Sequence, residues 1–175
     1  LHPRVRRQRQ MCIRDSAKAL MDKLDLSPSD RKVAIVANEK AKERNVNMLA
    51  IELNNGKIIT GKESKILSCT SAAFLNAIKE ITGIPDQEYL LSPTILDGIY
   101  KMKKKTSYNT SYFLNLPEVL IALSICSVTN PIIEKALNEL EQLRGADAHS
   151  SYIIEKSELN ALKNLGINLT CEPRM

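Results

Sequence analysis

The sequence predicts an α/β domain in which helices flank a mixed sheet in a three-layer arrangement, and three observations support this. Apolar residues make up 43% of the 175 residues, which is enough for a packed core. Two β-prone runs flank an Asn-Gly turn, and later in the chain short β-prone runs alternate with helical patterns. No apolar run reaches the roughly 20 residues that a membrane span needs. We therefore expect one sheet with helices packed on it.

The first sixteen residues differ from the rest in charge and origin. Leu1–Ser16 holds five arginines and one acid, and so carries four of the five net positive charges. One interpretation is a basic arm that binds nucleic acid. However, Arg6–Asp15 can be back-translated, codon by codon, into a transposase adapter used in DNA sequencing libraries, and Leu1-His2 matches the adapter's flank. We interpret residues 1–16 as a disordered, adapter-derived segment and exclude them from the fold.

This interpretation changes what the charge implies. The remaining residues hold 20 basic and 19 acidic side chains, a net charge of +1. Aromatic residues are only 4%, which argues against binding by base stacking. We therefore expect no nucleic-acid partner and no membrane partner. Ala17 would mark the start of a sequencing read, so that a larger N-terminal part is expected to be missing.

Residues 17–46 predict two helices, which we assign to the tail of an upstream domain. Apolar residues at Leu20, Met21 and Leu24 recur at helical spacing. Ser27-Pro28 then supplies a helix cap and a first-turn proline. The helices are expected over Ala17–Leu26 and Arg31–Arg44.

Residues 47–175 are expected to form the C-terminal α/β domain, with a helical insertion at about residues 93–144. The clearest local pattern is a β-hairpin, in which Asn54-Asn55-Gly56 connects Asn47–Leu53 to Lys57–Thr60 and Gly61 ends the second strand. Proline in first turns and glycine after last turns bound the later helices. The further elements are expected to be a helix, or a turn and a helix, over Ser64–Thr82, a strand over Gln87–Leu91, a helix from Ser92 to about Lys105, a loop over Thr106–Leu116, helices over Pro117–Ser127 and Pro131–Leu143, a strand over Ser150–Ile154, a helix over Ser157–Leu165 and a strand over Ile167–Thr170.

Familiar catalytic motifs are missing from the sequence. It contains no P-loop, no dinucleotide fingerprint, no H-E-x-x-H and no G-x-S-x-G. Beyond the first sixteen residues, His149 is the only histidine, and the three cysteines are far apart. We therefore expect no metal site, assign no cofactor and name no catalytic residue.

The order of hairpin, helix, strand and helix resembles the cytidine-deaminase-like topology. Leu49–Gly61 ends in Thr-Gly, like the deaminase hairpin, and Cys69 in the next helix matches a zinc ligand. Ser71, however, stands where deaminases have the glutamate that moves the proton of the attacking water. The second motif would fall at Pro93–Leu96, which holds no thiolate. We expect this topology without its zinc site.

Polar residues near two predicted strand ends are candidates for binding a small molecule or a phosphate group. After the hairpin, backbone N–H groups and hydroxyls could hold an anion, or the same residues could simply be caps and turns. These residues are Thr60, Lys62, Ser68, Thr70 and Ser71. In the second group, His149 either forms a structural hydrogen bond or acts as an acid/base contact. Adjacent Ser150 would point to the opposite face of a strand, so the two form no ready catalytic pair.

A basic cluster lies at Lys101–Lys105, with four lysines in five positions. It is typical of a solvated helix end, where lysine side chains interact favourably with the helix dipole. The alternative is a patch for a phosphate group or an acidic partner.

Several segments resemble the C-terminal portion of uncharacterised protein family 0371, which carries the domain of unknown function 1846. They are Leu120–Asn130, Glu134–Gly145, Ala148–Ser151 and Leu165–Pro173. The resemblance implies a bacterial, cytoplasmic protein with a larger N-terminal part. Some members have carried a metalloprotease label, which no motif here supports. The family's polar segments match Thr60-Gly61-Lys62, Thr129-Asn130 and His149-Ser150-Ser151, and with Ser71 these are the candidate ligand-binding residues.

Two functions follow as expectations. The first is a C-terminal domain that forms one wall of a small-molecule or phosphate-ligand site, contacts the rest of its own chain and takes part in a homo-oligomer. The alternative is a purely structural or oligomerisation domain, with any active site in the missing N-terminal part. Exposed apolar stripes on the helices of Pro117–Leu143 would indicate this alternative.

Overall fold

The computed structural model describes residues 16, 19–27, 30–106 and 112–172. Residues 1–32 and residues 33–175 are two separate units. In the first unit, residues 19–23 are helical, as expected within Ala17–Leu26, and the Ser27 amide donates to Asp30 Oδ2 at 2.6 Å. Apart from Ser16, the adapter-like segment lies outside the described residues, and its expected disorder stays a prediction.

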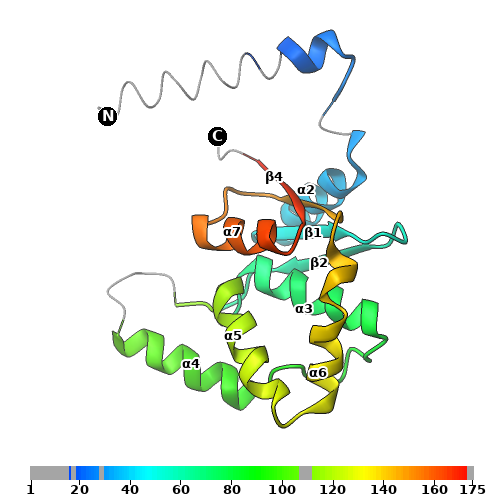
Figure 1. The fold of residues 1–175 in the computed structure, drawn as a ribbon. Helices are drawn as coiled ribbons and strands as arrows, with labels where there is room; N and C mark the ends of the chain where they lie inside the picture. Colours follow the sequence, from blue (N-terminus) through cyan, green and yellow to red (C-terminus); the bar gives the residue numbers. More distant parts are fainter. Residues whose placement is uncertain (1–15, 17–18, 28–29, 107–111, 173–175) are drawn as a thin grey trace. The chain divides into compact units, whose positions relative to one another are not determined.

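A four-stranded mixed sheet forms the centre of the second unit, which confirms the α/β class (Figure 1). Its strand order is β2-β1-β3-β4. β1 pairs antiparallel with both β2 and β3, whereas β3 and β4 run parallel. The strands are β1 (Met48–Glu52), β2 (Ile58–Lys62), β3 (Asp147–Ser150) and β4 (Asn168–Cys171).

The predicted hairpin forms where the Asn-Gly turn indicated. Gly56 has φ +79°, a value that glycine adopts without strain, and Asn55 Oδ1 accepts from the Lys57 amide at 2.9 Å. The prediction that Gly61 ends the second strand was wrong, because β2 continues through Gly61 and Lys62. Gly61 stays in the ladder opposite Leu49 and serves packing there.

Helices cover both faces of the sheet. On one face, Val33 and Ala37 of α2 (Lys32–Arg44) pack with Ala50 and Ile58. On the other, the main core joins Leu49 and Ile51 to the remaining helices. The assignment of residues 17–46 to an upstream domain stays a prediction. The helices of the main core are α3 (Cys69–Thr82), α4 (Pro93–Thr106), α5 (Leu116–Ser127), α6 (Pro131–Asn138) and α7 (Lys156–Asn164).

The packing of α3 on β2 depends on one glycine. A Cβ atom at Gly61 would lie 2.0 Å from the Ala73 backbone nitrogen and 2.6 Å from the Ala72 carbonyl carbon. No side chain fits at that distance, so the α3 backbone lies directly against the strand. This close approach explains why the sequence has Gly after Thr60, a pattern first interpreted as part of a ligand site.

The helix boundaries follow the expected caps, with one exception. Of the two alternatives for Ser64–Thr82, the turn followed by a helix is the one observed, and the helix ends at Gly83. The expected single helix over Pro131–Leu143 is instead α6 followed by the 3-10 helix η2 (Leu140–Leu143). The tighter last turn places Leu143 in the core, where it is fully buried.

Two strand predictions were wrong. Gln87–Leu91 forms turns, and its apolar residues Leu90 and Leu91 are buried in the core without strand pairing. The expected strand over Ser150–Ile154 lies earlier, at Asp147–Ser150. The run Tyr152-Ile153-Ile154 has higher β-propensity, but Ile153 is exposed to solvent and only Ile154 is buried.

The loop expected over Thr106–Leu116 is described only in part. Within it, Leu114 forms an isolated bridge with Leu67, ahead of the first residue of α5. None of the described helices is both long and apolar enough to cross a membrane.

Candidate functional site

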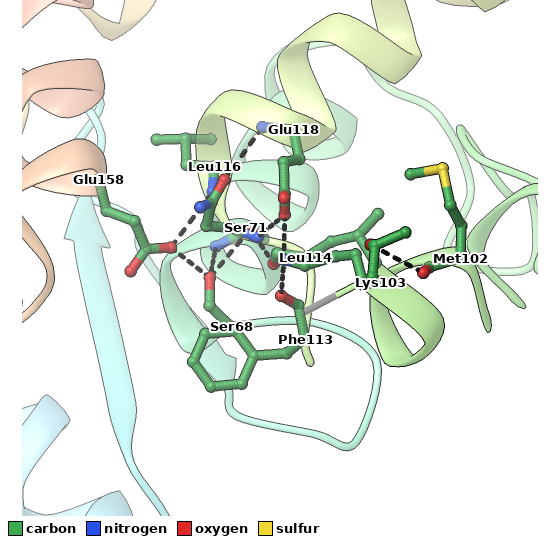
Figure 2. Close-up of polar contacts among 11 residues, drawn as sticks. Ser68, Ser71, Met102, Lys103, Phe113, Leu114, Leu116, Glu118 and Glu158 are labelled. Carbon is green, nitrogen blue, oxygen red and sulfur yellow. Dashed lines mark hydrogen bonds and ion pairs between the residues drawn. The ribbon is translucent and has the colours of Figure 1, made fainter. Parts of the chain in front are cut away.

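A buried polar cluster lies where α3, α5 and α7 begin. We call Ser68, Thr70, Ser71 and Glu158 the Glu158 cluster, and Figure 2 shows Ser68, Ser71 and Glu158. All four residues have 0% exposure. Burying a carboxyl group is costly unless its oxygens find partners, so the surrounding side chains must be arranged for it.

Hydrogen bonds run through this cluster from one helix start to the next. Glu158 Oε1 lies 2.5 Å from Ser68 Oγ and accepts from the Leu116 amide at 3.2 Å. Ser68 Oγ lies 2.9 Å from Ser71 Oγ, and the Ser71 hydroxyl donates to the Leu114 carbonyl at 3.0 Å. Because Ser68 is also the N-cap of α3, the carboxyl group of α7 joins the first residues of all three helices.

Burial changes the protonation equilibrium of Glu158. The Ser68 hydroxyl and the Leu116 amide both donate to Glu158 Oε1. Burial raises the pKa of Glu158, and these hydrogen bonds only partly oppose it. The protein therefore favours the protonated form of this carboxyl group more than water does.

One side of the cluster has fewer contacts. Thr70 Oγ1 and Glu158 Oε2 have no hydrogen-bond partner of ordinary geometry among the described residues. The Thr70 hydroxyl is nevertheless close enough to lower the pKa of Glu158 slightly. Thr70 therefore belongs to the electrostatic surroundings of the carboxyl group rather than to the hydrogen-bonded chain.

Cys69, which the deaminase resemblance matched to a zinc ligand, lies beside the cluster as a protonated thiol. Burial raises the pKa of Cys69 to about 12, although a hydrogen bond with Tyr152 lowers it. Burial also raises the pKa of Tyr152. A thiol with a pKa this high carries little thiolate near neutral pH and is a poor nucleophile there. Among the described residues, no three His, Cys, Asp or Glu side chains are placed to share a metal ion.

Thr60 and His149, two predicted site residues, lie in one row across the sheet. The register places Thr60, Ala50, His149 and Thr170 opposite one another, on the face that α2 covers. His149 is 4% exposed, and its Nδ1 lies 2.8 Å from Thr170 Oγ1. Its buried position favours a structural role in the sheet.

Residues of α2 and β4 border this row. Lys40 Nζ donates to Thr60 Oγ1 at 3.0 Å, and Asn38 Nδ2 donates to Glu172 Oε1 at 3.2 Å. The same Glu172 oxygen is 3.6 Å from His149 Nε2. Lys62 is exposed, at the end of β2 on the same face by strand alternation.

The other predicted site residues lie elsewhere. Gly61 and Ser150 flank Leu49 on the opposite face of the sheet. The Ser151 hydroxyl oxygen accepts a hydrogen bond from the Met48 amide at 3.0 Å. The predicted residues therefore divide between two sheet faces and do not form one site.

Thr129 and Asn130 lie in the turn between α5 and α6, which Figure 1 shows away from the sheet. Asn130 Oδ1 accepts from the Ile132 amide at 3.0 Å and caps α6. The Thr129 hydroxyl contacts the Cys126 carbonyl at 3.5 Å. Their polar groups therefore have local structural partners.

The lysine cluster is partly paired. Lys103 Nζ lies 2.7 Å from Glu118 Oε2 and donates to the Phe113 carbonyl at 2.7 Å (Figure 2). Lys101 pairs with Asp97 one turn earlier at 2.6 Å. The Lys103 contacts connect α4 to the start of α5, whereas Lys101, Lys104 and Lys105 are exposed, as expected for a solvated helix end.

Glu158 is the residue that sequence reasoning missed. The pattern that would have found it is the apolar stripe of α7, in which the buried residues are Glu158, Ala161 and Leu162. A glutamate at position i, with apolar residues at i+3 and i+4, lies on the buried face of its helix. Its carboxyl group then needs partners in the core.

An unusual feature also occurs on the surface, on α5 and α6. Ile121, Ile125, Val128 and Ile132 are 62%, 68%, 83% and 49% exposed, and we call them the α5–α6 apolar face. The opposite sides of the same helices bury Val119, Leu123 and Ile133 in the core. The exposed stripe that sequence analysis named as typical of a packing domain is therefore present.

The fold and the polar cluster define a mixed α/β domain with a buried polar centre that joins three helix starts. Residues 29–175 match the family model "Domain of unknown function DUF1846, C-terminal", and the chain belongs to this family. This confirms the resemblance noted from the sequence.

Curated bacterial relatives place the domain within a longer protein. The chain is 42% identical over 165 residues to a UPF0371 protein of Clostridium tetani, 41% to one of Clostridium botulinum strain Langeland over 165 residues, and 40% to one of Clostridioides difficile strain 630 over 167 residues. These matches cover 90% or 91% of this chain and 33% of each relative. The chain thus spans about a third of the length of the curated relatives it matches.

Proposed function

We propose that this chain is a structural and assembly domain of a longer protein, and that its polar centre holds helices together instead of binding a ligand. One observation carries the proposal. Ser68, at the start of α3 where the sequence suggested an anion, is hydrogen-bonded to the fully buried Glu158, and Ser71 is hydrogen-bonded to Ser68.

The energetics of the cluster support this role. Helix starts expose N–H groups that need acceptors, and Glu158 supplies one to the Leu116 amide while also bonding the N-cap of α3. Each such bond contributes about 1 kcal/mol, and leaving a partner unsatisfied in the core costs about 1–3 kcal/mol. The carboxyl group therefore stabilises the junction of three helices.

The length of the relatives supports the assembly part of the proposal. This chain corresponds to a third of each relative, and the family model it matches is a C-terminal domain. A domain of this kind can serve a longer protein by completing its fold, with any active site elsewhere in that protein.

A thermal-unfolding titration tests the proposal. The chain is titrated with inorganic phosphate and with ATP, and no saturable rise in Tm is expected. A saturable rise that Ser71→Ala abolishes would contradict the proposal, since Ser71 is part of the buried cluster. Ser124→Ala, an exposed serine on α5, is the matched control.

A phosphate site on the α2 face of the sheet is the second candidate, in keeping with the expected ligand role. The Lys40–Thr60 contact and the exposed Lys62 favour it. In the same titration, a Tm rise that Lys62→Ala removes and Ser71→Ala leaves intact would support this candidate. Catalysis by His149 would be a separate proposal, and its burial argues against it.

We further propose that the fold is of the cytidine-deaminase-like kind. The hairpin leads into α3, and the next strand of the sheet, β3, leads into α7. The second deaminase motif would then correspond to the start of α7 rather than to Pro93–Leu96, because the expected strand before Pro93 does not form. Glu158 lies in the first turn of that helix.

A further inference from the structure

We propose that the α5–α6 apolar face is the surface on which this domain packs against the N-terminal two thirds of a protein as long as its relatives. The inference rests on the proposed assembly function and names the surface and the partner. It starts from Ile121, Ile125, Val128 and Ile132, whose exposure is set out above.

The chemistry of the segment is that of an interface core. Val119–Ile133 contains no charged residue over fifteen positions. The polar residues within it are small or amide side chains, such as Ser124, Ser127 and Thr129. Depletion of charge with retention of large apolar groups distinguishes the centre of a protein interface from the rest of the surface.

The fold holds this face in a fixed position. Asn115 and Glu118 form a capping box at the start of α5, and Asn130 with Pro131 begins α6. On the inner side, Leu123 and Ile133 are 1% and 2% exposed. A helix pair anchored in this way presents its outer residues with little entropy left to lose on binding.

The spacing of the residues places three of the four on one side of a helix. Ile121, Ile125 and Val128 are four and three residues apart, which places them on one side of α5 and its C-cap. Ile132 follows in the first turn of α6, which packs beside α5. By contrast, exposed Ile35, Ile95 and Ile153 lie on different segments of the described chain.

The size of the face favours a partner in the same chain. A stable association between separate proteins needs about 800 Å² and 20–30 residues from each side. Four aliphatic side chains are a small fraction of such an interface. Domains of one chain can use a smaller contact, because their linkage gives the contact a high effective concentration.

Hydrogen–deuterium exchange tests the inference. The longer protein is expressed from its recovered reading frame and compared with the 175-residue chain. We expect peptides that cover α5 and the start of α6 to exchange at least tenfold more slowly in the longer protein, at all protein concentrations. Equal exchange in both proteins would overturn the inference, as would a gene that encodes no upstream domain.

A second copy of the chain is the other occupant that the experiment can reveal. In that case, protection would increase with protein concentration and would also occur in the 175-residue chain at high concentration. This result would overturn the in-chain inference while leaving the assembly function intact. Phosphate binding in the thermal titration would contradict the proposed function without changing the exchange result, so the two failures are distinguishable.

Ile125→Asp and Ile153→Asp provide a matched pair of variants. Both residues are exposed to nearly the same extent, 68% and 63%, but Ile153 lies in the connection before α7. In the longer protein, Ile125→Asp should remove most of the protection of α5 and Ile153→Asp should leave it unchanged. In the 175-residue chain, neither variant should shift Tm appreciably, which separates loss of docking from loss of folding. An equal loss of protection in both variants would contradict the inference.

Discussion

The Glu158 cluster and the α5–α6 apolar face are opposite exceptions to the rule that apolar residues are buried and charged residues are exposed. One is a carboxyl group inside the core, and the other is a set of large aliphatic groups in solvent. Exposed apolar patches and buried polar groups are the informative exceptions in a folded protein. The first exception has its partners within this chain, at the starts of α3 and α5. The second is largely exposed in this chain, and for that reason we propose it as the contact with the rest of the protein.

Removing the buried carboxyl group is expected to have the largest effect. Glu158→Ala removes the acceptor of the Leu116 amide and the partner of Ser68, and it leaves a cavity. We expect a loss of about 3–4 kcal/mol in the free energy of unfolding, measured by urea denaturation. Glu158→Gln keeps the volume and most contacts and should lose about 1 kcal/mol or less. An equal loss in both variants would show that an amide cannot replace the carboxyl group in these contacts, which is not expected for a carboxyl group whose pKa is raised.

The two sides of α5 should respond differently to the same truncation. Leu123 is in the core, so Leu123→Ala should cost about 2–4 kcal/mol. Ile125→Ala on the outer side should change the free energy of unfolding by less than about 0.5 kcal/mol in the 175-residue chain. Chemical denaturation of both variants measures the contrast. A cost above 1 kcal/mol for Ile125→Ala would show that the outer face already has a partner within this chain.

Stability should depend on pH through Glu158. Its folded pKa is raised, so its contribution is fully present below the unfolded pKa of about 4.3 and is lost as the pH rises through the folded pKa. The slope from this one group is at most about 1.4 kcal/mol per pH unit. Wild-type chain and Glu158→Gln are compared by denaturation from pH 5 to pH 9. Wild type should lose stability relative to Glu158→Gln as the pH rises, and a constant difference would indicate that Glu158 is ionised throughout.

A smaller loss than that at Glu158 or Leu123 is expected at the cap that orients the apolar face. Asn130 Oδ1 accepts from the Ile132 amide at the start of α6. Asn130→Ala should cost about 1 kcal/mol, and Asn130→Asp should keep most of the stability because aspartate caps equally well. Thermal unfolding measures the difference. Equal losses in both variants would show that the side chain of Asn130 acts by another route.

Local sequence patterns predicted much of this fold. The turn at Asn54-Asn55-Gly56 and the helix starts at Pro93, Pro117 and Pro131 depend on backbone preferences of a few adjacent residues, and each was found within a residue or two. The strand β3 was misplaced because its residues Asp147–Ser150 have weak β-propensity. It is held instead by β1 and β4 on either side, and such long-range pairing is invisible to local patterns.

The candidate site was harder to predict for the same reason. Thr60 and His149 are 89 positions apart in the numbering, and only the strand register shows that they share a row. The sequence analysis did not predict Glu158 as a site residue, although its spacing from Ala161 and Leu162 puts it on the buried stripe of α7. Its partners lie 42 and 90 positions away, at Leu116 and Ser68. Residue type alone gives no indication of such distant bonding.

Gly61 controls a distance that matters well beyond its own strand. Because a Cβ there would collide with the backbone at Ala72 and Ala73, the missing side chain sets how near the first turns of α3 come to the sheet. Ser68 and Ser71 lie just before that contact, where Ser68 bonds the Glu158 carboxyl group and Ser71 bonds Ser68. A methyl group at Gly61 would push α3 away from β2. It would thereby break the hydrogen bonds of Ser68 and Ser71 without contacting either residue.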